Sequence, residues 1–202
     1  MSKVFETVKQ VLYKESKAIM DAFESIDKAA IEKLVEIISQ CKGKILLSGC
    51  GTSGAAARKI AHTLSCVERP AFFLEPADAL HGGLGAVDSD DVVVLLSKGG
   101  ASLEINSLIK PLKTKKAFII GVTENEESVL AKESDLFIKI KVKEEADHTG
   151  LLATSSIIGV IAVFDAVAIA SAEITGFTRE KFSVIHPGGA VGQILLKKNQ
   201  IN

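Results

Sequence analysis

Apolar residues in the first 40 positions recur at the spacing of one face of a helix. They are Val4, Val8, Val11, Leu12, Ile19, Phe23, Ile31, Leu34, Val35 and Ile38. The stretch Ser25-Ile26-Asp27 interrupts this series, and aspartate is favoured at the position just before a helix. The pattern therefore predicts two N-terminal helices, the second of them capped by Asp27.

After residue 40 the pattern changes to short apolar runs that alternate with helical stretches. The runs cover residues 45–47, 71–74, 92–96, 117–122 and 136–142, and the helical stretches cover 54–66, 102–114 and 126–132. Short β-branched runs separated by helices are typical of a parallel sheet covered on both faces. The pattern therefore predicts an α/β fold.

The chain shows no repeat, low-complexity tract or linker, so we expect a single domain. Its parts are N-terminal helices at 1–40, a doubly wound core at 41–175 and a C-terminal segment at 176–202. That last segment contains the turn His186-Pro187-Gly188-Gly189, followed by a short apolar stretch that we expect to be helical.

Residues 151–172 are long and apolar enough to suggest a membrane-spanning helix, with Asp165 as the only charge. Thr154-Ser155-Ser156 near its start and the central aspartate oppose that interpretation, because a charge in hydrocarbon is expensive. A helix that is apolar all round is also typical of the buried interior of an α/β protein. We therefore expect a buried helix and no membrane partner.

Composition narrows the function classes only slightly. The chain has 202 residues and a formal net charge of -1, which gives no basic footprint for nucleic acid. Its three cysteines, Cys41, Cys50 and Cys66, fit neither a disulfide framework nor a zinc site. The N-terminus also lacks the pattern of a signal peptide. A cytoplasmic enzyme or binding protein is the expectation.

Two loops rich in glycine and hydroxyl groups each join a predicted strand to a predicted helix. Helix N-termini offer free N–H groups and a partial positive charge, which bind phosphate. The candidate phosphate-binding residues are Ser48, Gly49, Gly51, Thr52 and Ser53 in the first loop, and Ser97, Lys98, Gly99 and Ser102 in the second.

The spacing Gly49-x-Gly51-x-x-Gly54 also fits a dinucleotide, with Glu75 placed to bind a ribose. A second loop of similar chemistry favours a compact phosphomonoester over an extended pyrophosphate. Residues 75–85 and 144–150 follow other predicted strands, so all four segments are expected at one edge of the sheet.

Three stretches carry a resemblance to a known family: PAFFLEPADALHGGLGAV, EEADHTGLLATSS and GFTREKFSVIHPGGAVGQILL. Together with the paired loops they resemble the sugar isomerase (SIS) domain, and within it the D-arabinose 5-phosphate isomerases, from about residue 40 to the C-terminus. The resemblance implies a three-layer αβα sandwich with a five-stranded parallel sheet, flavodoxin-like, and a homotetramer with shared active sites. It also implies a sugar-phosphate substrate, and the chain resembles the short form without CBS modules.

The resemblance carries four catalytic roles to this chain. Glu145 is the leading candidate base for an enediol mechanism, Glu104 a supporting acid/base, and His81 or His186 would move oxygen protons. Each residue also has a simpler structural explanation. Glu104 could complement a helix dipole, and Glu145 could be an ordinary surface charge. His81 could close a turn, and His186 could fix a chain reversal or a subunit contact. This chemistry needs no metal or cofactor, and none is expected.

Three positions depart from the family pattern. Thr52 stands where a lysine is usual, Gly83 where an aspartate is usual, and Gly99 where a hydroxyl residue is usual. We expect Lys98 to replace the missing lysine in part, because it lies within the second loop. The departures leave a second hypothesis, a non-catalytic protein that binds or senses a phosphosugar.

Overall fold

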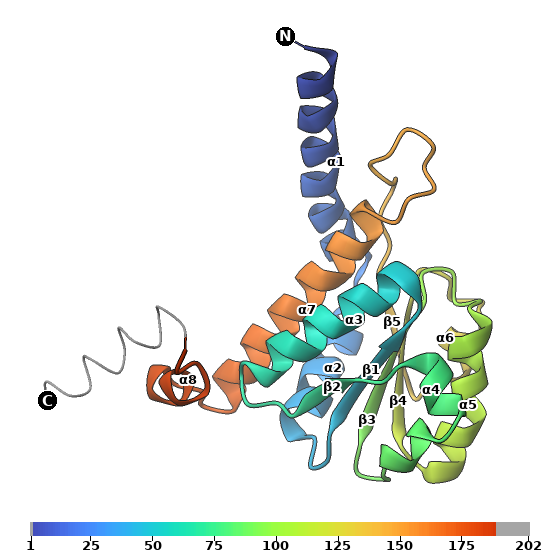
Figure 1. The fold of residues 1–202 in the computed structure, drawn as a ribbon, viewed down its shortest axis with the longest axis vertical. Coiled ribbons are helices and arrows are strands. Elements are labelled where there is room, and N and C mark those ends of the chain that lie inside the picture. Colours follow the sequence, from blue (N-terminus) through green and yellow to red (C-terminus); the bar gives the residue numbers. More distant parts are fainter. Residues whose placement is uncertain (1, 189–202) are drawn as a thin grey trace, which may run out of the picture.

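The computed structural model describes residues 2–188. At its centre is a parallel sheet with the strand order β2-β1-β3-β4-β5 (Figure 1). The strands are β1 (Ile45–Gly49), β2 (Ala71–Phe73), β3 (Val92–Leu96), β4 (Phe118–Thr123) and β5 (Leu136–Lys139). This is the order of the flavodoxin-like doubly wound folds, and it confirms the predicted α/β class.

Helices cover both faces of the sheet. One layer contains α2 (Lys28–Gln40), α3 (Gly51–Ser65) and α7 (Ser155–Ile174); the other contains α4 (Pro76–Leu80), α5 (Leu103–Lys115) and α6 (Val129–Glu133). Because side chains alternate along a strand, Ile45 and Leu47 pack into the first layer's core and Leu46 into the second. A buried apolar core thus lies on each face of the sheet, between the strands and a layer of helices, which gives the three-layer αβα sandwich.

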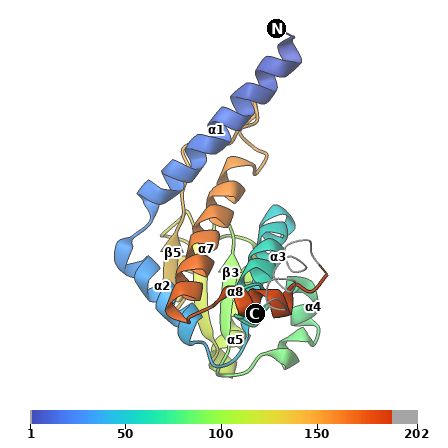
Figure 2. The same cartoon turned by 90° about the vertical axis from the view of Figure 1, so that its left-hand side faces the viewer.

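The N-terminal helix α1 (Lys3–Ser25) projects beyond the sandwich (Figure 2). Within the chain it buries only Ala18 and Ala22, at its contact with α7. Its C-terminal end leads into α2, where the Asp27 carboxylate accepts a hydrogen bond from the Ala30 N–H at 2.8 Å. The two predicted helices and the Asp27 cap are therefore confirmed.

The apolar helix predicted near residues 151–172 is α7, the one helix among residues 2–188 whose length and composition suit a membrane span. It packs against α1, α2 and α3, with Phe164 fully buried and Asp165 paired with Lys59 of α3. Its burial is incomplete, since Ile169 is 61% exposed. The expectation of a buried helix is therefore confirmed only on the side that faces the sheet and its neighbours.

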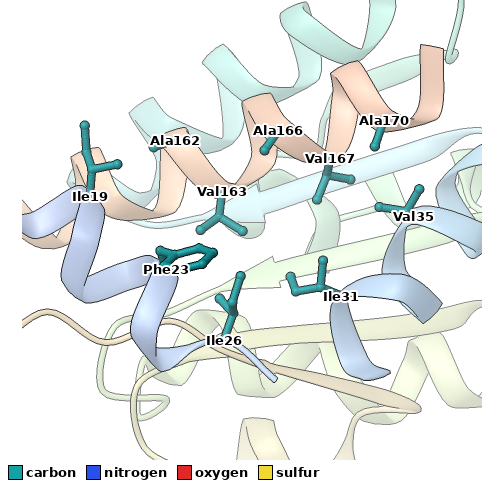
Figure 3. A pocket seen from close by; sticks show the side chains of 10 residues that line it. All are labelled: Ile19, Phe23, Ile26, Ile31, Val35, Ala162, Val163, Ala166, Val167 and Ala170. Carbon is teal, nitrogen blue, oxygen red and sulfur yellow. The ribbon is translucent and has the colours of Figure 1, made fainter. Parts of the chain in front are cut away.

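Where α7 packs against α1 and α2, the three helices line an apolar groove of about 320 Å³ (Figure 3). Figure 3 shows Phe23 and Ile26 of the α1–α2 corner pointing toward Val163. Ile19, Ile31, Val35, Ala162, Ala166, Val167 and Ala170 complete the lining, which contains no charged side chain. This groove has nothing that could bind a phosphate.

Three predicted boundaries were wrong. Helix α3 begins at Gly51 rather than 54, because the chain enters the helix directly after Cys50 at the end of β1. The fifth strand ends at Lys139 rather than 142, because the chain then turns to α1, where the Ser25 hydroxyl accepts a hydrogen bond from the Lys141 N–H at 2.9 Å. Helix α6 begins at Val129 rather than 126, because Asn125 forms a turn with Glu127 and Ser128 caps the helix. The chain continues into α8 (Arg179–Ile185). The helical stretch predicted after Gly189 lies outside the described residues.

Candidate functional site

The candidate site lies where the connections of the sheet change direction. From β1 the chain moves to β2 on one side, whereas β3 lies on the other side of β1. Ligands of open α/β sheets bind beyond the carboxyl ends of the strands at such a point. The two glycine-rich loops follow β1 and β3 and therefore flank it.

The first loop is a tight strand-to-helix turn. Gly51 has a φ of +56°, a conformation that glycine adopts without strain. A Cβ at Gly49 would lie 2.8 Å from the carbonyl oxygen of Ser53, so only glycine allows the strand end and the helix start to approach this closely. The backbone N–H groups that begin α3 are thereby brought to the sheet edge.

The hydroxyl groups of the first loop differ in exposure. Ser48 is fully buried, and its Oγ has no hydrogen-bond partner among the described residues. Ser53 lines a cavity at the sheet edge, while Thr52 is exposed in the first turn of α3. A buried hydroxyl without a partner costs free energy, so Ser48 is a group that a polar ligand would satisfy.

The second loop is held in shape by its own hydroxyl groups. Ser97 Oγ lies 3.0 Å from Oγ of Ser102, the residue that precedes α5. A Cβ at Gly100 would meet the Ser128 side chain at 2.3 Å, and the φ of Gly100 is +69°. Gly99, in contrast, has open space around its Cα. The loop thus presents the start of α5 to the sheet edge.

Residues after β4 fix the backbone of Lys98. Its carbonyl oxygen accepts hydrogen bonds from the Thr123 hydroxyl at 2.8 Å and from the Glu124 N–H at 2.9 Å. The loop after β4 was not predicted as part of the site. The available signal was that β4 also ends in polar residues at the same sheet edge.

The side chain of Lys98 forms an ion pair with Glu145. Lys98 Nζ lies 2.6 Å from Oε1 of Glu145, and the carboxylate side chain is 2% exposed. Burial alone would raise the pKa of Glu145, but the hydrogen bonds from Lys98, Ser156 and Thr154 outweigh it and lower the pKa to about 2. Glu145 is therefore ionised at neutral pH.

The second oxygen of Glu145 caps helix α7. Glu145 Oε2 accepts hydrogen bonds from the backbone N–H groups of Thr154 at 2.9 Å and Ser156 at 3.2 Å. A carboxylate at a helix N-terminus is stabilised by the free N–H groups and the helix dipole. Thr154 and Ser156 were seen in the sequence only as polar residues near an apolar run, although hydroxyl residues there also signal a helix start.

Glu104 lies across the site in the first turn of α5 and is exposed. Burial raises the pKa of the Cys50 thiol, and the charges of Glu104 and Glu75 raise it further, so Glu104 lies near the end of β1 where the first loop begins. Glu75 itself is paired with Arg58 of α3 at 2.9 Å. This pairing occupies the carboxylate that the dinucleotide interpretation assigned to a ribose.

The two candidate histidines lie in different places. His81 is exposed at the end of α4, in the loop region after β2. His186 lies with its Nε2 3.6 Å from Sγ of Cys66, the residue after the C-terminal end of α3. Helix α3 has 15 residues and is about 22 Å long.

Within one chain, the candidate catalytic residue His186 therefore lies away from the sheet edge that holds the glutamates. The last helix α8 follows α7 at the opposite end of the sandwich (Figure 1). His186 is stacked on Phe182 there, with the ring centroids 3.9 Å apart.

A cavity of about 30 Å³ lies between the two loops and α7. Its lining includes Ser53, Ser97, Lys98, Glu124 and Ser156. This volume holds about one water molecule. Lys98, whose ammonium group pairs with Glu145, is thus at this cavity too.

Within residues 2–188 no group of three or more histidine, cysteine, aspartate or glutamate side chains is arranged to hold a metal ion. Two other cations, Lys59 and Arg58 of α3, form ion pairs with Asp165 and Glu75. Lys98 is thus the cation placed between the two predicted phosphate loops and a buried carboxylate.

Comparison with known proteins gives a consistent picture. The chain is 38% identical over 188 residues to arabinose 5-phosphate isomerase KdsD of Yersinia pestis, a match that covers 93% of this chain but only 57% of that protein. A Listeria monocytogenes structure assigned to the sugar-phosphate isomerases has a TM-score of 0.91 and 46% identity, covering 93% of this chain and all of the other. An Escherichia coli CFT073 protein solved in complex with arabinose 5-phosphate has a TM-score of 0.88 and 36% identity, with the same coverage.

The sequence pattern of the SIS domain matches residues 37–170, which include both glycine-rich loops, Glu104 and Glu145. This range is most of the chain, and it contains the whole sheet, α3, α4, α5, α6 and most of α7. The chain belongs to the SIS domain family.

Proposed function

We propose that the chain is an aldose–ketose isomerase that interconverts arabinose 5-phosphate and ribulose 5-phosphate. The observation that carries the proposal is a buried carboxylate, Glu145, held between the second phosphate loop and the start of α7. A relative named arabinose 5-phosphate isomerase and a structural relative in complex with arabinose 5-phosphate support this substrate. The proposal takes residues 1–202 as one domain.

The phosphate group is assigned to the space in front of the two loops. The free N–H groups of α3 and α5 point to this edge, and the dipoles of both helices favour an anion there. The hydroxyl groups of Ser48, Ser53, Ser97 and Ser102 supply further hydrogen bonds. Ser48 gains most, because its buried Oγ otherwise has no partner within the described part of the chain.

The chemical step is a proton transfer between adjacent carbons. In the direction from aldose to ketose, the Glu145 carboxylate takes the proton from C2 and returns a proton to C1 of the enediol. Glu104 moves the proton between the oxygens on C2 and C1, so that the carbonyl passes from C1 to C2. No electrons leave the sugar, and the reaction as proposed uses no metal or cofactor.

A homotetramer with shared sites is part of the proposal. Apolar side chains of α1 are exposed in the single chain, among them Val4, Phe5, Val8, Leu12, Met20 and Phe23. Leu151 is 85% exposed in the loop that lies beside α1 (Figure 1). Patches of this kind mark protein interfaces, and the groove of Figure 3 continues the apolar surface.

His186 lies far from the glutamates of its own chain. In such an assembly it would therefore serve the site of another copy. Sedimentation equilibrium tests the assembly: Leu12→Glu is expected to yield smaller species, whereas the exposed control Gln10→Glu is not. The cytoplasmic location expected from the sequence stays a prediction, and fractionation of cells would test it.

Proton NMR in D2O tests the reaction. Ribulose 5-phosphate and arabinose 5-phosphate are expected to take up deuterium at the carbon next to the carbonyl, and Glu145→Gln is expected to abolish this exchange. Glu36→Gln, an exposed glutamate on α2, is the matched control and should exchange normally. Exchange that survives in Glu145→Gln would remove Glu145 as the base.

One observation favours the second candidate, a phosphosugar-binding protein without turnover. Both oxygens of Glu145 are engaged, one by Lys98 and one by α7, as expected of a purely structural carboxylate. In that case no sugar phosphate would exchange deuterium, but one would raise the melting temperature by several degrees when present well above its dissociation constant.

A further inference from the structure

The ion pair between Lys98 and Glu145 joins two parts of the site that have different tasks. The backbone of Lys98 belongs to the second phosphate loop, between Ser97 and Gly99. Its ammonium group, however, lies on the carboxylate of the proposed base at 2.6 Å. Once a phosphate enters the site, this ammonium group can pair either with the Glu145 carboxylate or with the phosphate.

Only one end of Lys98 is fixed. Its carbonyl oxygen is held by Thr123 and Glu124, whereas its side chain is 42% exposed and is held by Glu145 alone among the described residues. A lysine side chain is a flexible stem that carries a compact charge with three donors. The ammonium group can therefore move without a change in the loop.

Glu145 can lose Lys98 and stay in place. Its Oε2 remains bound to the N–H groups of Thr154 and Ser156 at the start of α7, so the carboxylate keeps its orientation. Oε1 is the oxygen that only Lys98 contacts among the described residues. Departure of the ammonium group would thus expose one oxygen of a carboxylate that the helix still holds.

We propose that Lys98 is shared between Glu145 and the phosphate of the substrate, and that phosphate binding draws the ammonium group away and frees Oε1 for proton transfer. The inference rests on the proposed function, because it assumes a substrate with a phosphate group. It assigns Lys98 a second task, which is to keep the base neutralised until the substrate is bound.

The charged surroundings of Glu145 favour this exchange. Lys98 is the cation that faces it from the loop after β3, and Glu124, from the loop after β4, is among the residues that line the cavity beside Lys98. The adjacent Glu144 is turned to Lys14 of α1 at 2.6 Å. No second cation within residues 2–188 is paired with Glu145, so its proton affinity follows the position of Lys98.

Carboxyl 13C NMR tests the exchange at equilibrium. The Glu145 signal, assigned by its loss in Glu145→Gln, is titrated with and without arabinitol 5-phosphate, which has no carbonyl and cannot isomerise. In the wild type the pKa of Glu145, which is about 2 in the free protein, is expected to rise in the complex because Lys98 no longer donates to the carboxylate.

Lys98→Met separates the exchange from simple repulsion by the phosphate. In this variant the pKa of Glu145 should already be higher without ligand than in the wild type, and binding should move it by less than half as much as in the wild type. Lys98→Met should also weaken binding of arabinitol 5-phosphate by about tenfold or more. An equal rise of the pKa in the two proteins would overturn the proposal, because repulsion alone would then explain it.

Two further measurements keep the test independent of how Lys98→Met folds. Lys98→Arg keeps the charge, so the pKa of Glu145 should again rise on ligand binding by more than it does in Lys98→Met. In the unmodified protein, the acid limb of kcat, which reports the substrate complex, should lie at higher pH than that of kcat/KM, which reports the free enzyme. Coincident limbs would count against the exchange.

The outcomes also distinguish this proposal from the proposed function. Suppose that the substrate exchanges deuterium but that ligand raises the pKa of Glu145 no more in the wild type than in Lys98→Met. The isomerase then stands, and the sharing of Lys98 is refuted. The converse result, a ligand-dependent pKa without exchange, leaves the sharing of Lys98 and removes the isomerase.

Discussion

Thr52 lies in the first turn of α3, at the position where the family resemblance places a lysine. It is exposed, and its neighbour Ser53 lines the same cavity as Lys98. A lysine at position 52 would therefore lie near the same anion as Lys98. Loss of one preorganised donor costs about 3 kcal/mol, or roughly a hundredfold in rate. We expect Lys98→Met to show a loss of this size.

If Lys98 replaces the missing lysine, adding Thr52→Lys to Lys98→Met should raise kcat/KM at least about tenfold. The same change in the wild type should raise kcat/KM by less than about threefold. Steady-state kinetics of the four proteins give the answer. An equal gain in both backgrounds would show that the two lysines act independently, and Thr52→Met serves as the control without a charge.

The other two departures from the family pattern differ in the space around them. A Cβ at Gly99 would meet no atom within 4 Å, so Gly99→Ser should leave the melting temperature unchanged and tighten phosphate binding by up to about tenfold through a new hydroxyl. A Cβ at Gly83 would lie 2.9 Å from the Asp78 carbonyl oxygen, so Gly83→Asp should destabilise the protein by about 1–3 kcal/mol. Calorimetry of binding and of unfolding checks both; the reverse order of stability would contradict the described loop geometry.

At the scale of elements, Glu145 links the site to the stability of α7. The hydrogen bonds that lower its pKa from 4.5 to about 2 stabilise the folded state above pH 4.5, by about 3 kcal/mol as an upper estimate. Below pH 4.5 the unfolded chain takes up the proton first, so this contribution falls as the pH drops toward 2.

Urea unfolding of the wild type and Glu145→Gln between pH 7 and pH 3 is the measurement. The wild type should be the more stable protein at pH 7, and the difference should narrow below pH 4.5 because only the wild type loses the contribution of an ionised Glu145. Glu36→Gln should show a small difference at every pH, since Glu36 is an exposed helix residue. A constant gap would mean that Glu145 does not titrate with unfolding.

The elements themselves could be predicted from the sequence because local patterns determine them. The helical spacing before residue 40, the Asp27 cap and the five apolar runs all correspond to observed elements. The end of β5 could not be predicted, since it depends on a contact between Lys141 and Ser25, 116 positions apart in the chain. Long-range contacts of this kind leave no periodic signal in the sequence.

The positions of the loops around the site could be predicted from the sequence, but the side-chain contacts between them could not. Strand ends and glycine-hydroxyl patterns placed both glycine-rich loops at the sheet edge where the structure has them, and Lys98 was expected to serve an anion there. Its pairing with Glu145 was not foreseen, because 47 residues separate the two and neither neighbourhood is unusual. The misplacement of His186 arose for a similar reason, because its family role alone does not say which chain supplies the histidine.

At the scale of the whole molecule, the exposed apolar face of α1 and the distance of His186 from the glutamates lead to one testable arrangement. A 23-residue helix that buries two residues within its own chain gains little from tertiary packing, and isolated helices are marginal in water. A second copy packed on α1 would stabilise it and could bring its own His186 to the site.

Mixed subunits test whether sites are shared between copies. Glu145→Gln and His186→Ala should each be nearly inactive alone. After unfolding and refolding together in equal amounts, they should regain about a quarter of the wild-type rate, because half of the sites keep Glu145 and half of those meet an intact His186. Each variant refolded alone is the control. If the mixture stays as inactive as its parts, while both variants assemble normally, each site draws Glu145 and His186 from the same chain, and the C-terminal segment must then reach its own sheet edge.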